Sequence, residues 1–222
     1  MGKLGIAVIG QAPRSFVEDM FRAALPAGTE TVLRGCLDGL SDAEVDALQP
    51  IDGGDTLYTR LRGERDVKIS KAAVIERAPA TLARLREDGA DAIVFACTGE
   101  FPAMPGDAGV VFPSRVLAGL AASLLPQGRL GLLVPAPEQI AKLSAKWERP
   151  NVTIVAEALM PSATEEDASD AGRRLGAGKP DLIAMDCMSY TPAAKAAVKR
   201  AAGVPAILAI SATSRVLGEL LS

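Results

Sequence analysis

Asp91-Ala92-Ile93-Val94-Phe95-Ala96-Cys97 has a counterpart further along the chain in Asp181-Leu182-Ile183-Ala184-Met185-Asp186-Cys187. Each stretch has the apolar run of a buried strand and ends with a cysteine. Two shorter segments also recur: Ser114-Arg115-Val116-Leu117 as Ser214-Arg215-Val216-Leu217, and Leu4-Gly5-Ile6 as Leu130-Gly131-Leu132. The distance along the chain from each segment to its counterpart is far longer than the period of a solenoid repeat. The matches therefore indicate two homologous α/β halves.

Between these matches, short apolar runs alternate with segments of helical period. This alternation predicts parallel sheets covered by helices on both faces. We therefore expect an α/β fold of two pseudo-symmetric, doubly wound parallel-sheet domains with the active site in the cleft between them. Expected strands are 5–9, 31–35, 92–96, 110–112, 130–134, 152–156, 182–185 and 205–210, and expected helices are 16–24, 72–88, 115–125, 138–147, 165–175, 193–201 and 214–221.

The domain boundary is expected near Pro126 to Gly128, so that the first half spans 1–126 and the second half 127–222. The terminal helix of the second half is free to pack on the first half. Residues 52–70 have no counterpart later in the chain, and Arg62-Gly63-Glu64 between two short runs predicts a hairpin insertion. An insertion of this kind serves as a lid, as an oligomer contact or as an exposed hairpin face.

Composition narrows the classes of function. Among the 222 residues, 49% are hydrophobic and 23% charged, and the net charge of −3 comes from intermixed acidic and basic residues. Without a basic block to neutralise phosphates, we expect no nucleic-acid partner. The apolar runs fall far short of the roughly 20 residues that span a bilayer, and the N-terminal run is too short for a signal peptide. We therefore expect a cytoplasmic protein with no membrane partner. The oligomeric state stays open, a homodimer included.

The chain has three cysteines and no histidine. An odd number of cysteines in a chain of this size favours free thiols over a disulfide framework. The absence of histidine excludes Ser-His-Asp catalysis, Cys-His catalysis and histidine-ligated zinc, and no metal site is predicted. Proton transfer must therefore use other groups.

Cys97 and Cys187 are the candidate catalytic residues. Both follow a strand, at the edge where α/β sheets bind ligands, beside the expected start of a helix whose dipole would favour a thiolate. One thiol could remove a proton next to a carboxylate and the other return it from the opposite face. The alternative is that both pack as small apolar residues. Cys36 has no counterpart in the repeat and is expected to pack.

Candidate substrate-binding residues lie at the same strand ends. Hydroxyl and amide groups there could hold carboxylate oxygens, or could simply cap helices. Arg14 could clamp a carboxylate bidentately, or could be a solvated arginine at a helix start. The candidates are Gln11, Arg14, Thr98, Gly99, Gln139, Ser189, Tyr190 and Thr191.

Five motifs resemble the AroM family over essentially the whole chain. They are Gly10-Gln11-Ala12-Pro13-Arg14, Gly53-Gly54-Asp55-Thr56 with Thr59-Arg60-Leu61, Pro113-Ser114-Arg115, Val134-Pro135 with Glu138-Gln139, and Leu182 through Asp186-Cys187. AroM proteins are similar to the aspartate/glutamate racemase superfamily. That resemblance implies catalysis without pyridoxal or another cofactor, in which one cysteine abstracts or donates a proton, or attacks a double bond, and the other completes the step. The chain departs from the racemases in lacking an acidic residue after the first strand and a histidine after the second cysteine.

The sequence therefore predicts a racemase or isomerase that acts on a small carboxylate through Cys97 and Cys187. Two alternatives remain. One is a decarboxylase that uses Cys187 alone to protonate an enediolate. The other is a carboxylate-binding or sensor protein without catalysis, because a two-domain cleft binds ligands whether or not it converts them.

Overall fold

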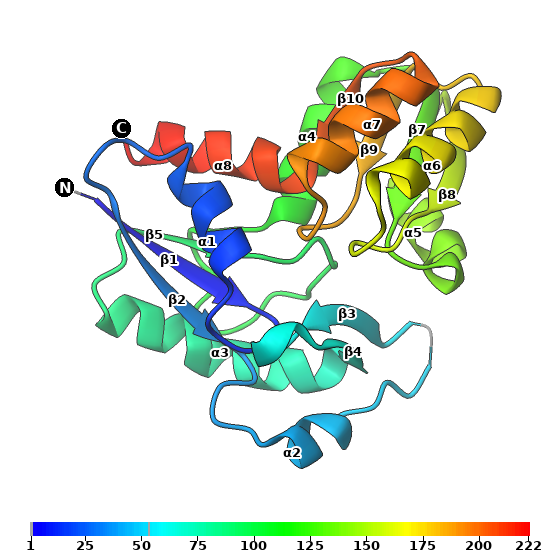
Figure 1. Ribbon diagram of the computed structural model, residues 1–222. Coiled ribbons are helices and arrows are strands. Elements are labelled where there is room, and N and C mark those ends of the chain that lie inside the picture. Colours follow the sequence, from blue (N-terminus) through cyan, green and yellow to red (C-terminus); the bar gives the residue numbers. More distant parts are fainter. Residues whose placement is uncertain (1, 53) are drawn as a thin grey trace. The chain divides into compact units, whose positions relative to one another are not determined.

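The computed structural model describes residues 2–52 and 54–222 (Figure 1). Gly53, which belongs to the predicted turn before the hairpin, and Met1 lie outside the described residues. By its internal contacts the chain forms two compact units. Unit 1 comprises Met1–Pro113 with Ser214–Ser222, and unit 2 comprises Ser114–Thr213. The boundary expected from the sequence lies later, between 126 and 127. In the structure the helix that ends before residue 126 belongs to unit 2, and the end of the terminal helix belongs to unit 1.

Unit 1 is built on a four-stranded parallel sheet in the order β2-β1-β5-β6. Figure 1 shows helices α1 and α3 on opposite sides of this sheet, as expected for a doubly wound fold. Its elements are β1 Lys3–Val8, α1 Ser15–Arg22, β2 Glu30–Gly35, α2 Asp42–Asp46, β3 Thr56–Arg60, the 3-10 turn η1 Arg62–Glu64, β4 Asp66–Ser70, α3 Lys71–Glu87, β5 Ala92–Phe95 and β6 Val110–Val111.

Unit 2 contains a second four-stranded parallel sheet, in the order β10-β9-β7-β8. Its elements are α4 Pro113–Leu124, β7 Gly128–Val134, the 3-10 turn η2 Pro137–Gln139, α5 Ile140–Trp147, β8 Val152–Ala158, α6 Glu165–Ala177, β9 Leu182–Met185, α7 Pro192–Ala202, β10 Ala206–Leu208 and α8 Ala209–Leu220. Two helices contain a boundary between the units. The first residue of α4, Pro113, counts with unit 1 and the rest of α4 with unit 2, whereas α8 begins in unit 2 and belongs to unit 1 from Ser214 onward.

The two sheets have the same topology, which confirms the predicted duplication. Taking β7, β8, β9 and β10 as the partners of β1, β2, β5 and β6, the strand orders are identical. The detail repeats as well, since the carboxylate of Asp91 accepts the amide of Lys3 at 2.8 Å and that of Asp181 accepts the amide of Arg129 at 2.8 Å. Each aspartate thus fixes the start of a central strand against its neighbour.

The predicted hairpin is present and belongs to the core of unit 1. Strands β3 and β4 pair in antiparallel register from Thr56 opposite Ser70 to Arg60 opposite Asp66. Leu57 and Ile69 join the same buried cluster as the apolar side of α3. A Cβ on Gly10 would lie 2.7 Å from the carbonyl oxygen of Arg60, so glycine is required where the loop after β1 meets the hairpin.

Two expectations from the sequence are wrong in detail. Helix α2 was not predicted, although Ser41 and Glu44 form a capping box at its start. The last strand was expected over 205–210 but covers Ala206–Leu208, and α8 begins at Ala209 instead of 214. An apolar pair such as Ala209-Ile210 fits either a strand end or a buried helix start, so the local pattern does not distinguish them.

Candidate active site

The two candidate thiols occupy equivalent loops, one in each unit. Cys97 lies two residues after β5, and Cys187 lies two residues after β9. In each loop the amide two residues further on donates to the sulfur: from Gly99 to Cys97 Sγ at 3.3 Å, and from Ser189 to Cys187 Sγ at 3.5 Å. An N–H group directed at a sulfur stabilises its thiolate more than its thiol, so both loops are suited to hold a charged sulfur.

The expectation that a helix starts beside each cysteine holds for Cys187 alone. The loop after Cys97 leads to β6 without a helix over residues 96–109. After Cys187, helix α7 begins at Pro192, and the hydroxyl of its N-cap Thr191 accepts the amide of Ala194 at 3.0 Å. The helix dipole can therefore contribute near Cys187, whereas Cys97 depends on its own loop.

The loop of Cys97 packs closely against the hairpin insertion. Cys97 is half-buried and Thr98 is buried. A Cβ on Gly99 would lie 3.2 Å from the side chain of Leu57 in β3 and 3.4 Å from Cys97 Sγ. A larger residue at position 99 would have to displace these neighbours, so glycine allows the hairpin to form a wall beside this thiol.

Cys36 has the environment of a packing residue, as its lack of a repeat partner suggested. It is buried in the core cluster of unit 1, against which Cys97 also packs. Burial raises the pKa of the Cys36 thiol to about 12, a hydrogen bond with Thr81 opposing the shift. Cys36 therefore stays protonated at neutral pH, where a reactive cysteine must ionise.

Arg14 lies at the N-cap of α1 and contacts the hairpin. Its Nη1 donates to the carbonyl oxygen of Arg60 at 2.8 Å. Arg60 in turn pairs with Asp66 across the hairpin, at 2.7 Å from Nε to Oδ1. Burial raises the pKa of Asp66, but hydrogen bonds from Arg60 and Tyr58 and the charges of Arg60 and Arg14 outweigh it, so this pKa lies below its ordinary value. Arg14 and Arg60 thus place two positive charges against one carboxylate.

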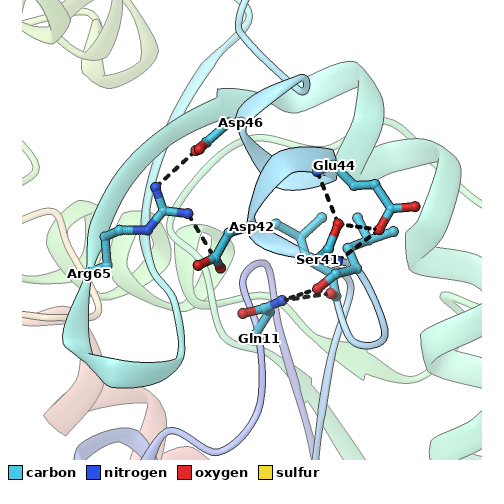
Figure 2. Close-up of polar contacts among 8 residues, drawn as sticks. Gln11, Ser41, Asp42, Glu44, Asp46 and Arg65 are labelled. Carbon is cyan, nitrogen blue, oxygen red and sulfur yellow. Dashed lines mark hydrogen bonds and ion pairs between the residues drawn. The ribbon is translucent and has the colours of Figure 1, made fainter.

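Gln11 is buried and holds the neighbouring loop in place. Its amide nitrogen donates to the carbonyl oxygens of Leu37 and Leu40, at 3.3 and 2.9 Å. Figure 2 shows the Gln11 side chain with these two contacts as dashed lines. The same close-up shows Arg65 of the hairpin segment pairing with Asp46 of α2 at 2.9 Å. These contacts fix the loops after β1 and β2 and the position of α2.

Three further candidates belong to unit 2. Tyr190 is buried and its hydroxyl donates to the carbonyl oxygen of Leu159 at 2.7 Å. Burial raises the pKa of Tyr190 well above its ordinary value, and the neighbouring Cys187 and Asp186 add to the shift. Ser189 is half-buried beside the sulfur that its amide contacts. The buried Oε1 of Gln139, at the N-cap of α5, has no hydrogen-bond partner within the described part of the chain.

A buried ion pair next to Cys187 was missed at the sequence level. Lys146 Nζ contacts the two carboxylate oxygens of Asp186 at 2.9 and 3.2 Å, and Trp147 Nε1 donates to the same carboxylate at 2.8 Å. The side chains of Lys146 and Asp186 are 5% and 0% exposed. The available signal was the aspartate at the end of an apolar strand, where the first repeat has Ala96.

Comparison with protein families identifies the chain. A family model described as AroM protein matches residues 4–221. The chain belongs to the AroM protein family. A search of curated protein sequences gives no significant match.

The fold of this AroM chain is similar to solved structures of a decarboxylase, an isomerase and a racemase. Unliganded arylmalonate decarboxylase has a TM-score of 0.64 at 16% identity, covering 100% of this chain and 92% of that one. Maleate isomerase Iso from Pseudomonas putida S16 has a TM-score of 0.64 at 13% identity, with coverage of 99% and 92%. Glutamate racemase from Francisella tularensis subsp. tularensis SCHU S4 in complex with D-glutamate has a TM-score of 0.60 at 15% identity, with coverage of 99% and 81%. At these identities the likeness shows a shared fold.

Within the described residues, no helix of the AroM chain is long and apolar enough to cross a bilayer.

Proposed function

We propose that this chain is a cofactor-independent racemase or isomerase of a small carboxylate, in which Cys97 and Cys187 transfer protons. The observation that carries the proposal is the repeated thiol environment: each cysteine follows the equivalent strand, and each sulfur accepts the amide two residues further on, at 3.3 and 3.5 Å. Packing alone does not require an N–H group directed at each sulfur. The likeness in fold to a glutamate racemase and a maleate isomerase supports the same class of reaction.

In the proposed racemisation, one cysteine starts as a thiolate and the other as a thiol. The thiolate takes the proton from the carbon next to the carboxylate, and the electron pair moves onto the carboxylate to form an enediolate. The second thiol then donates its proton to the opposite face of that carbon and becomes the thiolate. This scheme requires the two sulfurs to lie on opposite sides of one substrate, about 6 to 9 Å apart, which is hydrogen-bond reach on each side.

The loop residues are proposed to hold the carboxylate and the enediolate. Thr98 and Ser189 bring hydroxyl groups beside the two thiols, and Arg14 brings a positive charge to the hairpin side of unit 1. Gln139 is proposed to bind the substrate through its Oε1, which would accept a hydrogen bond from the ammonium group of an amino acid. Gln11, Tyr190 and Thr191 already bond to the backbone and are proposed to shape the site.

A decarboxylase that uses Cys187 alone is the second candidate. The surroundings of the two thiols favour it, because Cys187 follows Asp186, which pairs with Lys146, and precedes α7, whereas Cys97 follows the uncharged Ala96 and no helix lies over the described residues 96–109. The likeness in fold to arylmalonate decarboxylase points in the same direction. In this reaction the substrate loses CO2, the resulting enediolate takes a proton from Cys187, and solvent restores that proton.

The proposal can be tested by proton exchange. The protein is incubated with candidate amino acids, hydroxy acids and dicarboxylates in deuterated water, and NMR follows loss of the α-proton signal and release of CO2. A racemase gives α-proton exchange with inversion of configuration. A decarboxylase gives a product that has gained one deuterium and lost one carboxylate. No exchange or CO2 release across a broad set of carboxylates would count against both reactions.

Single serine variants then assign the thiols. Serine keeps the shape of cysteine but is a far weaker acid, so its effect should appear in turnover and not in folding. In a racemase, Cys97→Ser and Cys187→Ser each block proton removal from one enantiomer. In a decarboxylase, Cys187→Ser abolishes activity and Cys97→Ser keeps most of it. Cys36→Ser is the matched control, because Cys36 is buried in the core cluster of unit 1 and burial raises its pKa to about 12, so it stays protonated at neutral pH.

A further inference from the structure

The buried pair of Lys146 and Asp186 stands beside one of the two candidate thiols and has no counterpart beside the other. Asp186 and Ala96 occupy equivalent positions, since the amide of each donates to the central strand of its own sheet, Ala96 to Ala7 at 2.7 Å and Asp186 to Leu133 at 2.9 Å. The strand end therefore forms equally well with alanine. The fold of this strand end does not by itself require an aspartate.

Stability does not account for the pair either. Removing two charged side chains from water costs free energy that their attraction often fails to recover, and apolar residues of similar size commonly replace such pairs without loss of stability. Both side chains are nearly inaccessible here, and Trp147 also donates to the carboxylate. Because the pair occurs at only one of the two equivalent strand ends, a role for Cys187, which follows that strand end, explains it better than stability does.

Among the described contacts, Asp186 precedes Cys187 in its loop, Tyr190 lies within electrostatic reach of both, and Lys146 on α5 pairs with Asp186. Tyr190 is buried, and burial together with the charges of Cys187 and Asp186 raises its pKa, so the phenol is neutral. The charges of Asp186 and Cys187 both raise the pKa of Tyr190, so the two side chains share one electrostatic environment. The charge balance near Cys187 therefore depends on Asp186 and the lysine that neutralises it.

We infer that the Lys146–Asp186 pair acts on Cys187 through charge: it keeps the electrostatic environment next to that thiol balanced. It makes the two cysteines inequivalent, because Cys97 has the uncharged Ala96 in the matching place. The inference rests on the proposed function only in treating Cys187 as a working thiol. Asp186 and Lys146 act through Cys187 and need not touch the substrate.

The test measures the pH dependence of alkylation of Cys187 by iodoacetamide, followed by mass spectrometry of the Cys187 peptide. A Cys97→Ser background removes coupling to the other thiol, and Cys36 stays protonated because burial raises its pKa to about 12. Asp186→Asn keeps an acceptor for Trp147 but leaves the positive Lys146 unbalanced, which favours the thiolate. We expect the midpoint of the alkylation profile to fall by about one pH unit.

The double variant Lys146→Met with Asp186→Asn separates charge balance from simple loosening of the loop. It removes both charges together, so the midpoint should return to that of the parent protein. A loop that is merely loosened would instead be at least as perturbed in the double variant as in the single one. The inference is overturned if Asp186→Asn leaves the midpoint unchanged, or if the double variant stays shifted as far as the single variant.

Two further variants keep the test conclusive. If Asp186→Asn does not fold, Lys146→Met is compared with the double variant, and its midpoint should be higher because an unbalanced carboxylate disfavours the thiolate. An equal or lower midpoint overturns the inference. Glu157→Gln is the matched control, because it removes a carboxylate of unit 2 from a more exposed pair with Arg174, and it should leave the midpoint unchanged. Alkylation needs no substrate. The alkylation profile therefore tests this inference even if the proton-exchange experiment finds no activity.

Discussion

Replacing Lys146 by methionine tests how strongly unit 2 depends on its buried ion pair. Methionine is apolar and of similar length, so the main change is that Asp186 loses its counter-ion at 2.9 Å while its side chain stays fully buried. Breaking such a pair by removing one partner costs about 3 to 5 kcal/mol, because an uncompensated charge remains in the interior. For a chain of this size, that loss lowers the melting temperature by on the order of 10 °C.

The single tryptophan makes the measurement local. Trp147 lies next to Lys146, donates to Asp186 and is buried, so its fluorescence reports on the same site during urea denaturation. The expected result is a lower midpoint at an unchanged slope, which indicates a loss of stability without a change in the surface exposed on unfolding.

The double variant Lys146→Met with Asp186→Asn is the informative comparison. It removes both charges of the pair together and keeps an acceptor for Trp147, so its cost should be about 1 kcal/mol or less. Glu157→Gln breaks a partly exposed pair and should cost no more than about 1 kcal/mol. If Lys146→Met cost less than this control, or as little as the double variant, the assignment of an uncompensated buried charge would be wrong.

Three other predictions follow from contacts in unit 1 and α4. Arg14→Lys should weaken binding of the exchanging carboxylate at least tenfold, with an unchanged circular dichroism spectrum, because a lysine cannot offer the two parallel donors of a guanidinium; equal dissociation constants by calorimetry would exclude this role. Gly35→Ala should lower the free energy of unfolding in urea by about 1 to 3 kcal/mol, because its Cβ would lie 2.4 Å from a backbone oxygen. Gly119→Ala, whose Cβ would have nothing within 4 Å, should raise the free energy of unfolding by about 0.5 to 1 kcal/mol. The opposite order of stabilities would contradict the packing. Asp66→Asn should cost about 1 kcal/mol at pH 7, where the carboxylate is bonded to Arg60. Because the folded pKa of Asp66 is lowered, its contribution is present above the unfolded pKa of about 3.9 and is lost as the pH falls through the lower folded value, so thermal unfolding of wild type and variant should converge in acid.

The secondary structure and the duplication could be predicted from the sequence, because both depend on local patterns. Strand β9 has the predicted bounds Leu182–Met185, since a short apolar run lies there between charged residues. The hairpin was also identified, from two short runs around Arg62-Gly63-Glu64. The repeated segments predicted two sheets of one topology, and the strand orders confirm it. Periodicity and turn residues are properties of neighbouring positions, so one sequence is enough to detect them.

The candidate site was predicted only in part. The equivalent positions of Cys97 and Cys187 follow from the repeat, because equivalent sequence positions occupy equivalent strand ends. The absence of a helix after Cys97 does not follow, since that loop is fixed by packing against Leu57 of a hairpin far earlier in the chain. For the same reason Gln11 could not be recognised as a buried residue bonded to the carbonyl of Leu40.

Only the tertiary structure showed that Asp186 is paired with Lys146 and Trp147. The aspartate was visible as a charged residue at the end of an apolar strand, but its partners lie 40 and 39 positions earlier, on α5. No local pattern connects the end of β9 with the last turn of a helix that precedes it by two other elements. The sequence alone determined which residues are apolar, repeated or able to ionise. The pairing was decided by the packing of α5 against the sheet, because the free energy of a charge depends on what surrounds it in space and not on its neighbours along the chain.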